Sequence, residues 1–336
     1  MKSKSLFKRF LLAHLFLCLA ASTPLYADEN YANRDDVQVF IQEMVAKNSF
    51  NVDELNRVFA LAKFQPSVIK AILPPSSPNV RSWARYKPRF VNAQRIAKGR
   101  AFMAKYADTL KRASVTYQVP PEIIASIIGV ETVYGTNTGN YRVIDALTTL
   151  SFDYPKRADY FKTELEAFLL LCREQNSDVF AMKGSYAGAV GLPQFMPSNI
   201  RKLAVDFDND GVIDLRNNPI DAIGSIARYF QAFGWQQNAP IAVAIDAAEP
   251  IPATYLPDIT PVLTYSDVAS VKFLLQTTEN QRILDEGTKF AFIPLESPNA
   301  ATEYWLGFNN FYVITRYNKS SFYAMSVLQL ADAIKE

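Results

Sequence analysis

The spacing of apolar residues predicts that most of this chain is helical. Between residues 35 and 73 apolar positions recur three and four residues apart, which predicts several short helices, with Asn51 or Asp53 as a cap. Residues 93–115 have the pattern of one long amphipathic helix. Residues 160–174 are rich in leucine and phenylalanine on all sides, which predicts a helix inside the core. Further helices are predicted over 198–205, which Ser198 can cap, 223–230 and 321–336.

The pattern changes after Trp235. Short runs of strand character follow, separated by proline, glycine and asparagine: 241–245, 250–252, 289–294 and 311–315. We therefore predict a mainly α (α+β) fold with a small β-rich insertion.

One apolar helix carries an unusual acidic residue. Pro120 and Pro121 suit the start of a helix, and Ile124, Ile127 and Ile128 lie seven, four and three residues before Glu131. These positions share one face of a helix, so Glu131 belongs to the buried stripe.

Two readings of Glu131 follow from this placement. In the first, Glu131 is a general acid. Apolar neighbours disfavour its ionised form, and the nearby helix C-terminus carries partial negative charge, so both effects raise the pKa of Glu131 towards that of a general acid. A structural glutamate that accepts hydrogen bonds from backbone donors would have the same pattern. The segment by itself leaves both open.

The N-terminus has the layout of a secretory signal peptide. Four basic residues precede an apolar stretch, and small residues end it at Ala27, before Asp28 and Glu29. The stretch is short for a membrane span, so we predict cleavage after residue 27 and an exported, soluble protein. Lipid attachment at Cys18 is disfavoured because Leu17 precedes it, where acylation signals prefer a small residue.

Composition narrows the possible chemistry. Without residues 1–27 the 35 Lys and Arg become 31 against 33 Asp and Glu, a balance that does not favour nucleic acid as a partner. The single histidine, His14, lies in the signal segment, which excludes a Ser-His-Asp triad, a Cys-His pair and histidine-bound zinc in the mature chain. Cys172 is predicted to be a buried thiol.

Residues 206–214 match the first nine positions of an EF-hand loop. The predicted ligands are the carboxylates of Asp206, Asp208 and Asp210 and the carbonyl of Val212. Three carboxylates this close repel one another unless a hard cation binds them. A metal-free turn held by aspartate side chains is the alternative.

The end of this loop departs from the EF-hand pattern. Position 12, normally a bidentate glutamate, is Asn217, so we predict that Asp221 supplies the last ligand. Calcium suits such a site, and sodium could occupy it. We expect a structural ion and no organic cofactor.

Five segments taken together carry a family resemblance. They are 129–135 (GVETVYG), 152–157 (FDYPKR), 184–198 (GSYAGAVGLPQFMPS), the loop at 206–214 and 314–318 (ITRYN). In this order they resemble the lytic murein transglycosylase B family, and the likeness covers nearly all of the mature chain.

The resemblance implies a lysozyme-like α core with an additional helical domain and a small inserted β domain. The implied division after the signal peptide is an α domain, a catalytic core with the EF-hand-like loop and a β-rich domain, at 28–112 (completed by 319–336), 113–240 and 241–318.

The resemblance also implies an activity: cleavage of the β-1,4 bond between N-acetylmuramic acid (MurNAc) and N-acetylglucosamine (GlcNAc) in peptidoglycan, which leaves a 1,6-anhydromuramoyl end. Glu131 would be the acid and then the base. Lys156 and Arg157 would meet peptide or muramoyl carboxylates. Other implied substrate residues are Tyr86, Ser185, Gln194, Tyr317, Asn318 and Tyr323.

Four of these substrate residues also have a structural interpretation. Ser185 and Gln194 could satisfy backbone groups in a glycine-rich turn, and Tyr317 and Tyr323 could be core aromatics with bonded hydroxyls. At the level of function, the alternatives are a hydrolytic muramidase with Asp145 or Asp153 as second carboxylate, a non-catalytic peptidoglycan-binding protein, and a calcium-dependent adhesion protein. The expected setting is the periplasm of a Gram-negative bacterium, with a monomeric protein acting on glycan strands, alone or with peptidoglycan synthases or amidases.

Overall fold

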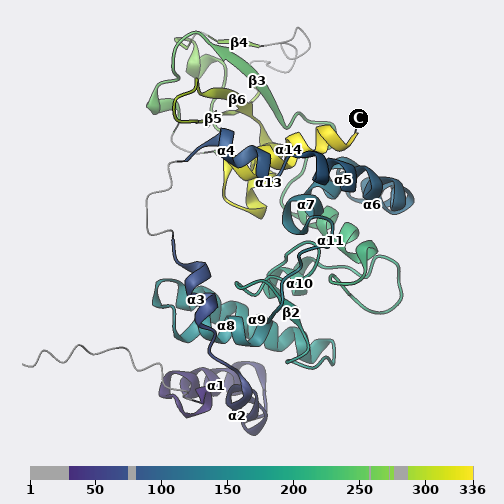
Figure 1. The fold of residues 1–336 in the computed structure, drawn as a ribbon, viewed down its shortest axis with the longest axis vertical. Helices are drawn as coiled ribbons and strands as arrows, with labels where there is room; N and C mark the ends of the chain where they lie inside the picture. Colours follow the sequence, from purple (N-terminus) through teal and green to yellow (C-terminus); the bar gives the residue numbers. More distant parts are fainter. Residues whose placement is uncertain (1–29, 75–80, 257–258, 272, 276–286, 336) are drawn as a thin grey trace, which may run out of the picture.

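The chain folds into an elongated molecule with helices along most of its length and a sheet at one end (Figure 1). The computed structural model describes residues 30–74, 81–256, 259–271, 273–275 and 287–335. The predicted signal segment, residues 1–27, lies outside these. Within the described part, no helix has the length and apolarity to cross a membrane. The predicted mainly α fold is confirmed.

Three short helices open the described chain, as predicted: α1 (Asp35–Asn48), α2 (Val52–Leu61) and α3 (Pro66–Ile72). Asn51 caps α2 by accepting hydrogen bonds from the N–H groups of Asp53 and Glu54. These helices lie at the end of the molecule occupied by α8 (Val143–Phe152) and α9 (Ala158–Glu174) (Figure 1). Cys172 of α9 is a buried free thiol, as predicted, and burial raises its pKa to about 11.

The prediction of one long helix over residues 93–115 is wrong. The structure has α5 (Ala93–Lys105) and α6 (Ala107–Tyr117), and Tyr106 between them leaves the helical region with φ −111° and ψ 26°. The two helices pack on different partners, since α5 contacts α7 (Pro121–Thr132) and α14 (Ser321–Lys335), whereas α6 packs mainly against α11 (Pro219–Ala232). Apolar periodicity continues across the break and conceals it.

Helix α10 (Pro197–Leu203) begins one residue before the predicted cap, Ser198. Ser198 lies in its first turn, and the Ser198 hydroxyl donates to Glu164 of α9 at 2.7 Å. The cap prediction is therefore wrong, because the side chain is used to join two helices. Asn218 caps α11 by accepting from the Ile220 N–H.

A four-stranded antiparallel sheet follows, in the order β4-β3-β6-β5. Its strands are β3 (Ala242–Ala247), β4 (Phe273–Leu275), β5 (Ala291–Leu295) and β6 (Glu303–Gly307). The strands predicted at 241–245 and 289–294 are confirmed, β4 and β6 were not predicted, and residues 250–252 form no strand. One face of β5 joins the main core and the other forms a small second core with Val243 and Leu306.

The strand predicted at 311–315 is wrong, because this segment lies in α13 (Asn309–Tyr317). Asn310 fixes the start of that helix: its side chain accepts from the Gln236 N–H at 2.8 Å and donates to the carbonyls of Gln236 and Ala239. Phe311 and Ile314, three residues apart, then share a buried helical face.

The remaining elements are short. A two-residue pair joins β1 (Tyr141–Arg142) to β2 (Lys183–Gly184), and α4 covers Trp83–Tyr86. The 3-10 turns are η1 (Tyr31–Asn33), η2 (Lys87–Arg89), η3 (Pro155–Arg157), η4 (Ala253–Tyr255) and η5 (Ser266–Val268).

Candidate active site

Glu131 lies in the last turn of α7, where its side chain meets the start of α14. Ile124, Ile127 and Ile128 are fully buried on the same helix, as the spacing predicts. The Tyr323 hydroxyl of α14 donates to Glu131 Oε1 at 2.6 Å. Burial raises the pKa of Glu131 to about 7, and the hydrogen bond from Tyr323 opposes that rise.

Two further tyrosines contribute to the surroundings of this carboxyl. The rings of Tyr317 and Tyr323 stack with 6.4 Å between centroids and 15° between planes. The charge of Glu131 contributes to raising the pKa of both, and of Tyr86 as well, after burial. Glu131 therefore contacts Tyr323 and lies within electrostatic range of Tyr317 and of Tyr86, which comes from a segment far away in the sequence.

Tyr317 also holds the backbone of the glycine-rich segment. Its hydroxyl donates to the Pro193 carbonyl at 2.6 Å. The next residue, Gln194, is in the left-handed region with φ 50°. Gly191 is required nearby, because a Cβ atom there would lie 2.2 Å from the Leu215 carbonyl oxygen.

Gln194 and Ser185 satisfy backbone groups of the glycine-rich turn, as their structural interpretation predicts, but each keeps one polar group free of these contacts. The Gln194 amide donates to the carbonyls of Gly191 and Thr138, at 2.9 and 3.3 Å, which leaves its Oε1 as an acceptor. Ser185 Oγ accepts from the Ala189 N–H at 3.1 Å and keeps its own proton for donation. Both side chains brace the turn and retain a group that a ligand could use.

Two residues that the sequence reasoning missed support this arrangement. Thr132 Oγ1 lies 3.3 Å from the Leu192 carbonyl and so links the end of α7 to the glycine-rich segment. The Tyr229 hydroxyl donates to the Arg316 carbonyl at 2.7 Å, and its ring packs against Tyr317. Their positions in the sequence give no separate signal, because their partners lie 60 and 87 residues away.

The other predicted substrate residues are less closely connected to Glu131. Asn318 is exposed directly after α13, and Lys156 and Arg157 are exposed on η3, between α8 and α9. The Arg157 guanidinium lies 4.4 Å from the centre of the Tyr160 ring.

Both alternative carboxylates are engaged in structural contacts. Asp145 is 3% exposed and accepts two hydrogen bonds from Arg142 at 2.7 Å and one from the Lys63 N–H. Asp153 accepts from Arg34 at 2.6 Å and from the Tyr31 hydroxyl. Both carboxylates therefore serve as hydrogen-bond acceptors that hold the fold together.

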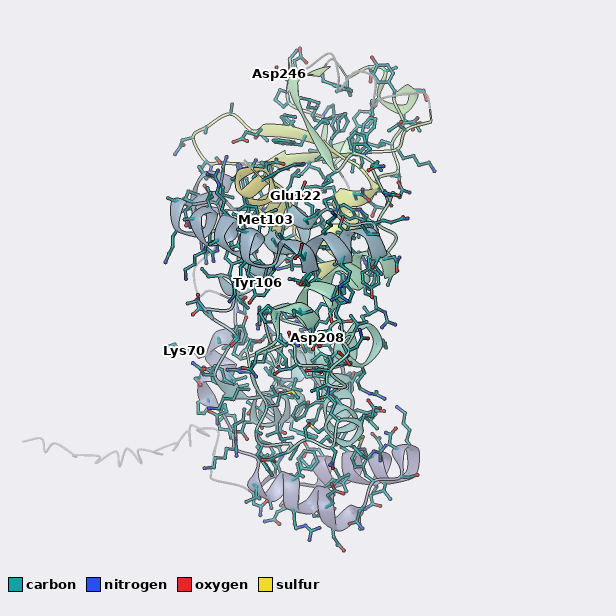
Figure 2. The ribbon with its side chains drawn as sticks, turned by 90° about the vertical axis from the view of Figure 1, so that its right-hand side faces the viewer. Lys70, Met103, Tyr106, Glu122, Asp208 and Asp246 are labelled. Carbon is teal, nitrogen blue, oxygen red and sulfur yellow. The ribbon has the colours of Figure 1, made fainter. Side chains whose placement is uncertain are left out.

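The EF-hand-like loop brings three predicted ligands together. Carboxylate oxygens of Asp206, Asp208 and Asp210 lie within 4.8 Å of one another. Asp206 accepts from the N–H groups of Asp210 and Gly211, and Gly211 makes the turn with φ 90°. Figure 2 shows Asp208 about halfway along the molecule. Such an oxygen-rich cluster fits a hard cation.

Asp221 lies apart from this cluster and is fully buried at the start of α11. Its two oxygens accept from the N–H groups of Phe207 and Asp214, each at 2.8 Å. Burial raises the pKa of Asp221. The carboxylate thus joins the two ends of the loop, while the predicted role of Asp221 as a ligand is untested, as is that of the Val212 carbonyl.

Comparison with known proteins places the chain in a family. The profile of the transglycosylase SLT domain matches residues 32–332. The membrane-bound lytic murein transglycosylase B of Escherichia coli is 41% identical over 321 residues, which are 91% of this chain and 84% of that protein.

Solved structures agree with this match. The catenated lytic transglycosylase SltB1 of Pseudomonas aeruginosa is 42% identical, with a TM-score of 0.84 over 91% of this chain and 98% of that one. The E. coli lytic transglycosylase Slt35 in complex with calcium is 40% identical, with a TM-score of 0.81 over 92% of this chain and 95% of that one.

A more distant relative was solved with a ligand. SltB3 of P. aeruginosa, in complex with NAG-NAM-pentapeptide, is 27% identical, with a TM-score of 0.75 over 89% of this chain and 78% of that one. Because the SLT profile covers nearly all of the described residues and the sequence match reaches 41%, this chain belongs to the lytic transglycosylase family.

Proposed function

We propose that this protein cleaves the MurNAc-β-1,4-GlcNAc bond of peptidoglycan and leaves a 1,6-anhydromuramoyl end, with Glu131 as acid and then base. The observation that carries this proposal is the environment of Glu131. Its pKa of about 7 keeps a large fraction protonated near neutral pH. The hydrogen bond from Tyr323 occupies Oε1, so Oε2 can face the glycosidic oxygen.

The reaction balances with one carboxyl group. Glu131 gives its proton to the glycosidic oxygen as the bond from that oxygen to C1 of the muramoyl residue breaks. The 6-hydroxyl of the same residue then bonds to C1, and the Glu131 carboxylate takes its proton. Because the nucleophile belongs to the substrate, no second carboxylate is needed to activate water, unlike in ordinary glycosidases.

The surrounding residues would position the muramoyl residue. The free acceptor of Gln194 and the hydroxyl proton of Ser185 suit the acetamido group and the sugar hydroxyls. Asn318 is exposed and available to the sugar. Tyr86, Tyr317 and Tyr323 supply ring surface that excludes water and disfavours hydrolysis.

The loop at 206–214 is proposed to hold a structural calcium ion. Asp206, Asp208 and Asp210 would be the carboxylate ligands and Val212 the carbonyl ligand, with Asp221 either completing the set or bracing the loop. The Slt35 structure with calcium supports this assignment by similarity.

The proposed substrate defines the setting. A protein that acts on glycan strands has to reach the periplasm, in agreement with the export signal predicted for residues 1–27. The protein would bind peptidoglycan through contacts with the sugars and with the carboxylates of the peptide. Lys156 and Arg157 would be among the residues that contact the peptide carboxylates. The relative solved with NAG-NAM-pentapeptide supports this class of ligand.

Mass spectrometry of the fragments released from purified peptidoglycan tests the proposal. The wild-type protein should release anhydromuramoyl ends, and Glu131→Gln should lose about 100-fold or more of that activity because a general acid typically contributes 10² to 10⁴. Glu122→Gln is the matched control, in the first turn of the same helix and paired with Lys335. Reducing muramic ends would identify a muramidase, and binding without release would identify a binding protein.

A further inference from the structure

A pocket with positively charged walls lies between the edge strand β5 and the link from α13 to α14. Its volume is about 690 Å³. Strand β5, α13 and α4 lie next to one another at this end of the molecule (Figure 1). The charged side chains among its described lining residues are Arg81, Glu296, Arg316 and Lys319, which are three cations and one carboxylate.

These cations are not neutralised within the described part of the chain, where none of the three forms an ion pair. Arg81 donates to Ser321 Oγ at 2.6 Å, and its guanidinium lies 4.3 Å from the centre of the Phe322 ring. The Arg316 guanidinium lies near aromatic rings, and Lys319 is exposed. An anion that enters the pocket could therefore accept hydrogen bonds from Arg81, Arg316 and Lys319, none of which is paired with a carboxylate in the described part of the chain.

Helix α14 separates the pocket from the proposed active site, because residues two positions apart on a helix point to different sides. Ser321 lines the pocket, and Tyr323 donates to Glu131. Phe322, between them, packs under Arg81 and lies 5.5 Å from the Tyr86 ring. The charge of Arg81 lowers the pKa of Tyr86 and that of Glu131 raises it, so both groups lie within electrostatic range of the same ring.

We propose that this pocket binds carboxylates of the peptide stem carried by a muramoyl residue next to the cleaved bond. This inference rests on the proposed function and specifies which part of the substrate that function recognises. Five extended residues span about 16 to 18 Å, the length over which a stem on a sugar beside Glu131 would pass around α14, by way of Tyr86, to the pocket. The pocket is distinct from the pair Lys156 and Arg157, which belongs to η3.

Binding to an inactive protein tests this. The probe is fluorescently labelled N-acetylmuramoyl-pentapeptide, titrated by anisotropy into Glu131→Gln and into Glu131→Gln with Arg316→Gln and Lys319→Gln. Two exposed charge pairs correspond to a rise in Kd of about 2- to 30-fold, and this rise should shrink at high salt. Amidating the probe carboxylates should weaken binding to the first protein by a larger factor than binding to the second, in which Arg81 and the pair Lys156 and Arg157 remain.

The control carries two other exposed lysines, Lys70→Gln and Lys111→Gln, so that the net charge changes equally. Equal Kd values for test and control variants would overturn the proposal, as would a Kd indifferent to amidation or no binding of the probe. Thermal melting checks that each variant is folded. The readout does not depend on turnover, so failure of the chemistry assigned to Glu131 would appear in the product assay, separately from this result.

Discussion

At the scale of single residues, the protein sets the acidity of Glu131 by two opposing effects. Burial against the isoleucine face of α7 disfavours the carboxylate, and the donated hydrogen bond from Tyr323 favours it. The first effect is larger, so the pKa lies above its usual value of 4.5, at about 7. The proposed mechanism needs the protonated form of Glu131, which is present below this pKa and lost as the pH rises through it.

The variant Tyr323→Phe is expected to move the alkaline limb of the pH–activity profile to higher pH. Loss of the donor leaves burial unopposed, so the pKa of Glu131 rises further. The measurement is kcat/KM on soluble glycan strands between pH 5 and 9. Tyr229→Phe is the control, because its hydroxyl bonds the Arg316 carbonyl. A limb that stays in place or moves to lower pH would contradict the assigned role of the bond.

At the scale of elements, α11 packs closely against the loop at 206–214. Gly224 leaves room for the Phe207 ring: a Cβ atom at position 224 would lie 2.4 Å from that ring. Asp221, one turn earlier, accepts hydrogen bonds from both ends of the loop. Helix and loop therefore form one unit.

Gly224→Ala should destabilise the protein by about 1 to 3 kcal/mol, although alanine is ordinarily the better helix former. The clash with Phe207 has to be relieved by moving the loop. Urea unfolding checks this, with the exposed Gln231→Ala on the same helix as control, for which a change within about 0.5 kcal/mol is expected. A stabilised Gly224→Ala would mean that the ring moves aside at little cost.

Calcium should raise the melting temperature. A cation that binds only the folded protein adds about 2.7 kcal/mol at a concentration of 100 times its Kd. The shift should disappear in Asp208→Asn, which removes one charge from the cluster of three carboxylates. Differential scanning calorimetry with calcium, with sodium alone and with a chelator separates the two candidate ions. An equal shift in Asp208→Asn would place the ion elsewhere.

At the scale of the whole molecule, Asp153 joins the N-terminal helices to the rest of the chain. It accepts from Arg34 and Tyr31, which lie 119 and 122 residues away. The predicted α domain of 28–112 with 319–336 stays a prediction. Its first three helices lie at the α8 and α9 end, whereas α5 lies beside α14 (Figure 1).

Asp153→Asn should reduce stability by about 1 to 3 kcal/mol, because Arg34 loses a partly buried ionic partner. Transglycosylase activity at 25 °C should change little. Urea unfolding and the product assay check the two statements. Loss of activity in a stably folded Asp153→Asn would instead support the muramidase mechanism, in which this residue is the second carboxylate.

Several features were determined by the sequence alone because they depend on neighbours along the chain. The buried stripe with Glu131, the cap at Asn51 and the three-aspartate cluster arise from spacings of two to seven residues, and local geometry brings those residues together. The family motifs in the sequence also predicted the fold and the activity. Local periodicity also caused the errors, since it could not detect the break at Tyr106 or the helix over 309–317.

The tertiary structure decided everything that depends on distant partners. Only the fold puts Tyr323 against Glu131, 192 residues away, and Tyr317 against the Pro193 carbonyl, 124 residues away. The same long-range packing engages Asp153 in the contact with Arg34. Burial and hydrogen bonding set a pKa, and both are properties of the assembled core. A sequence can therefore name the candidate carboxyl, whereas the acidity of that carboxyl depends on the fold.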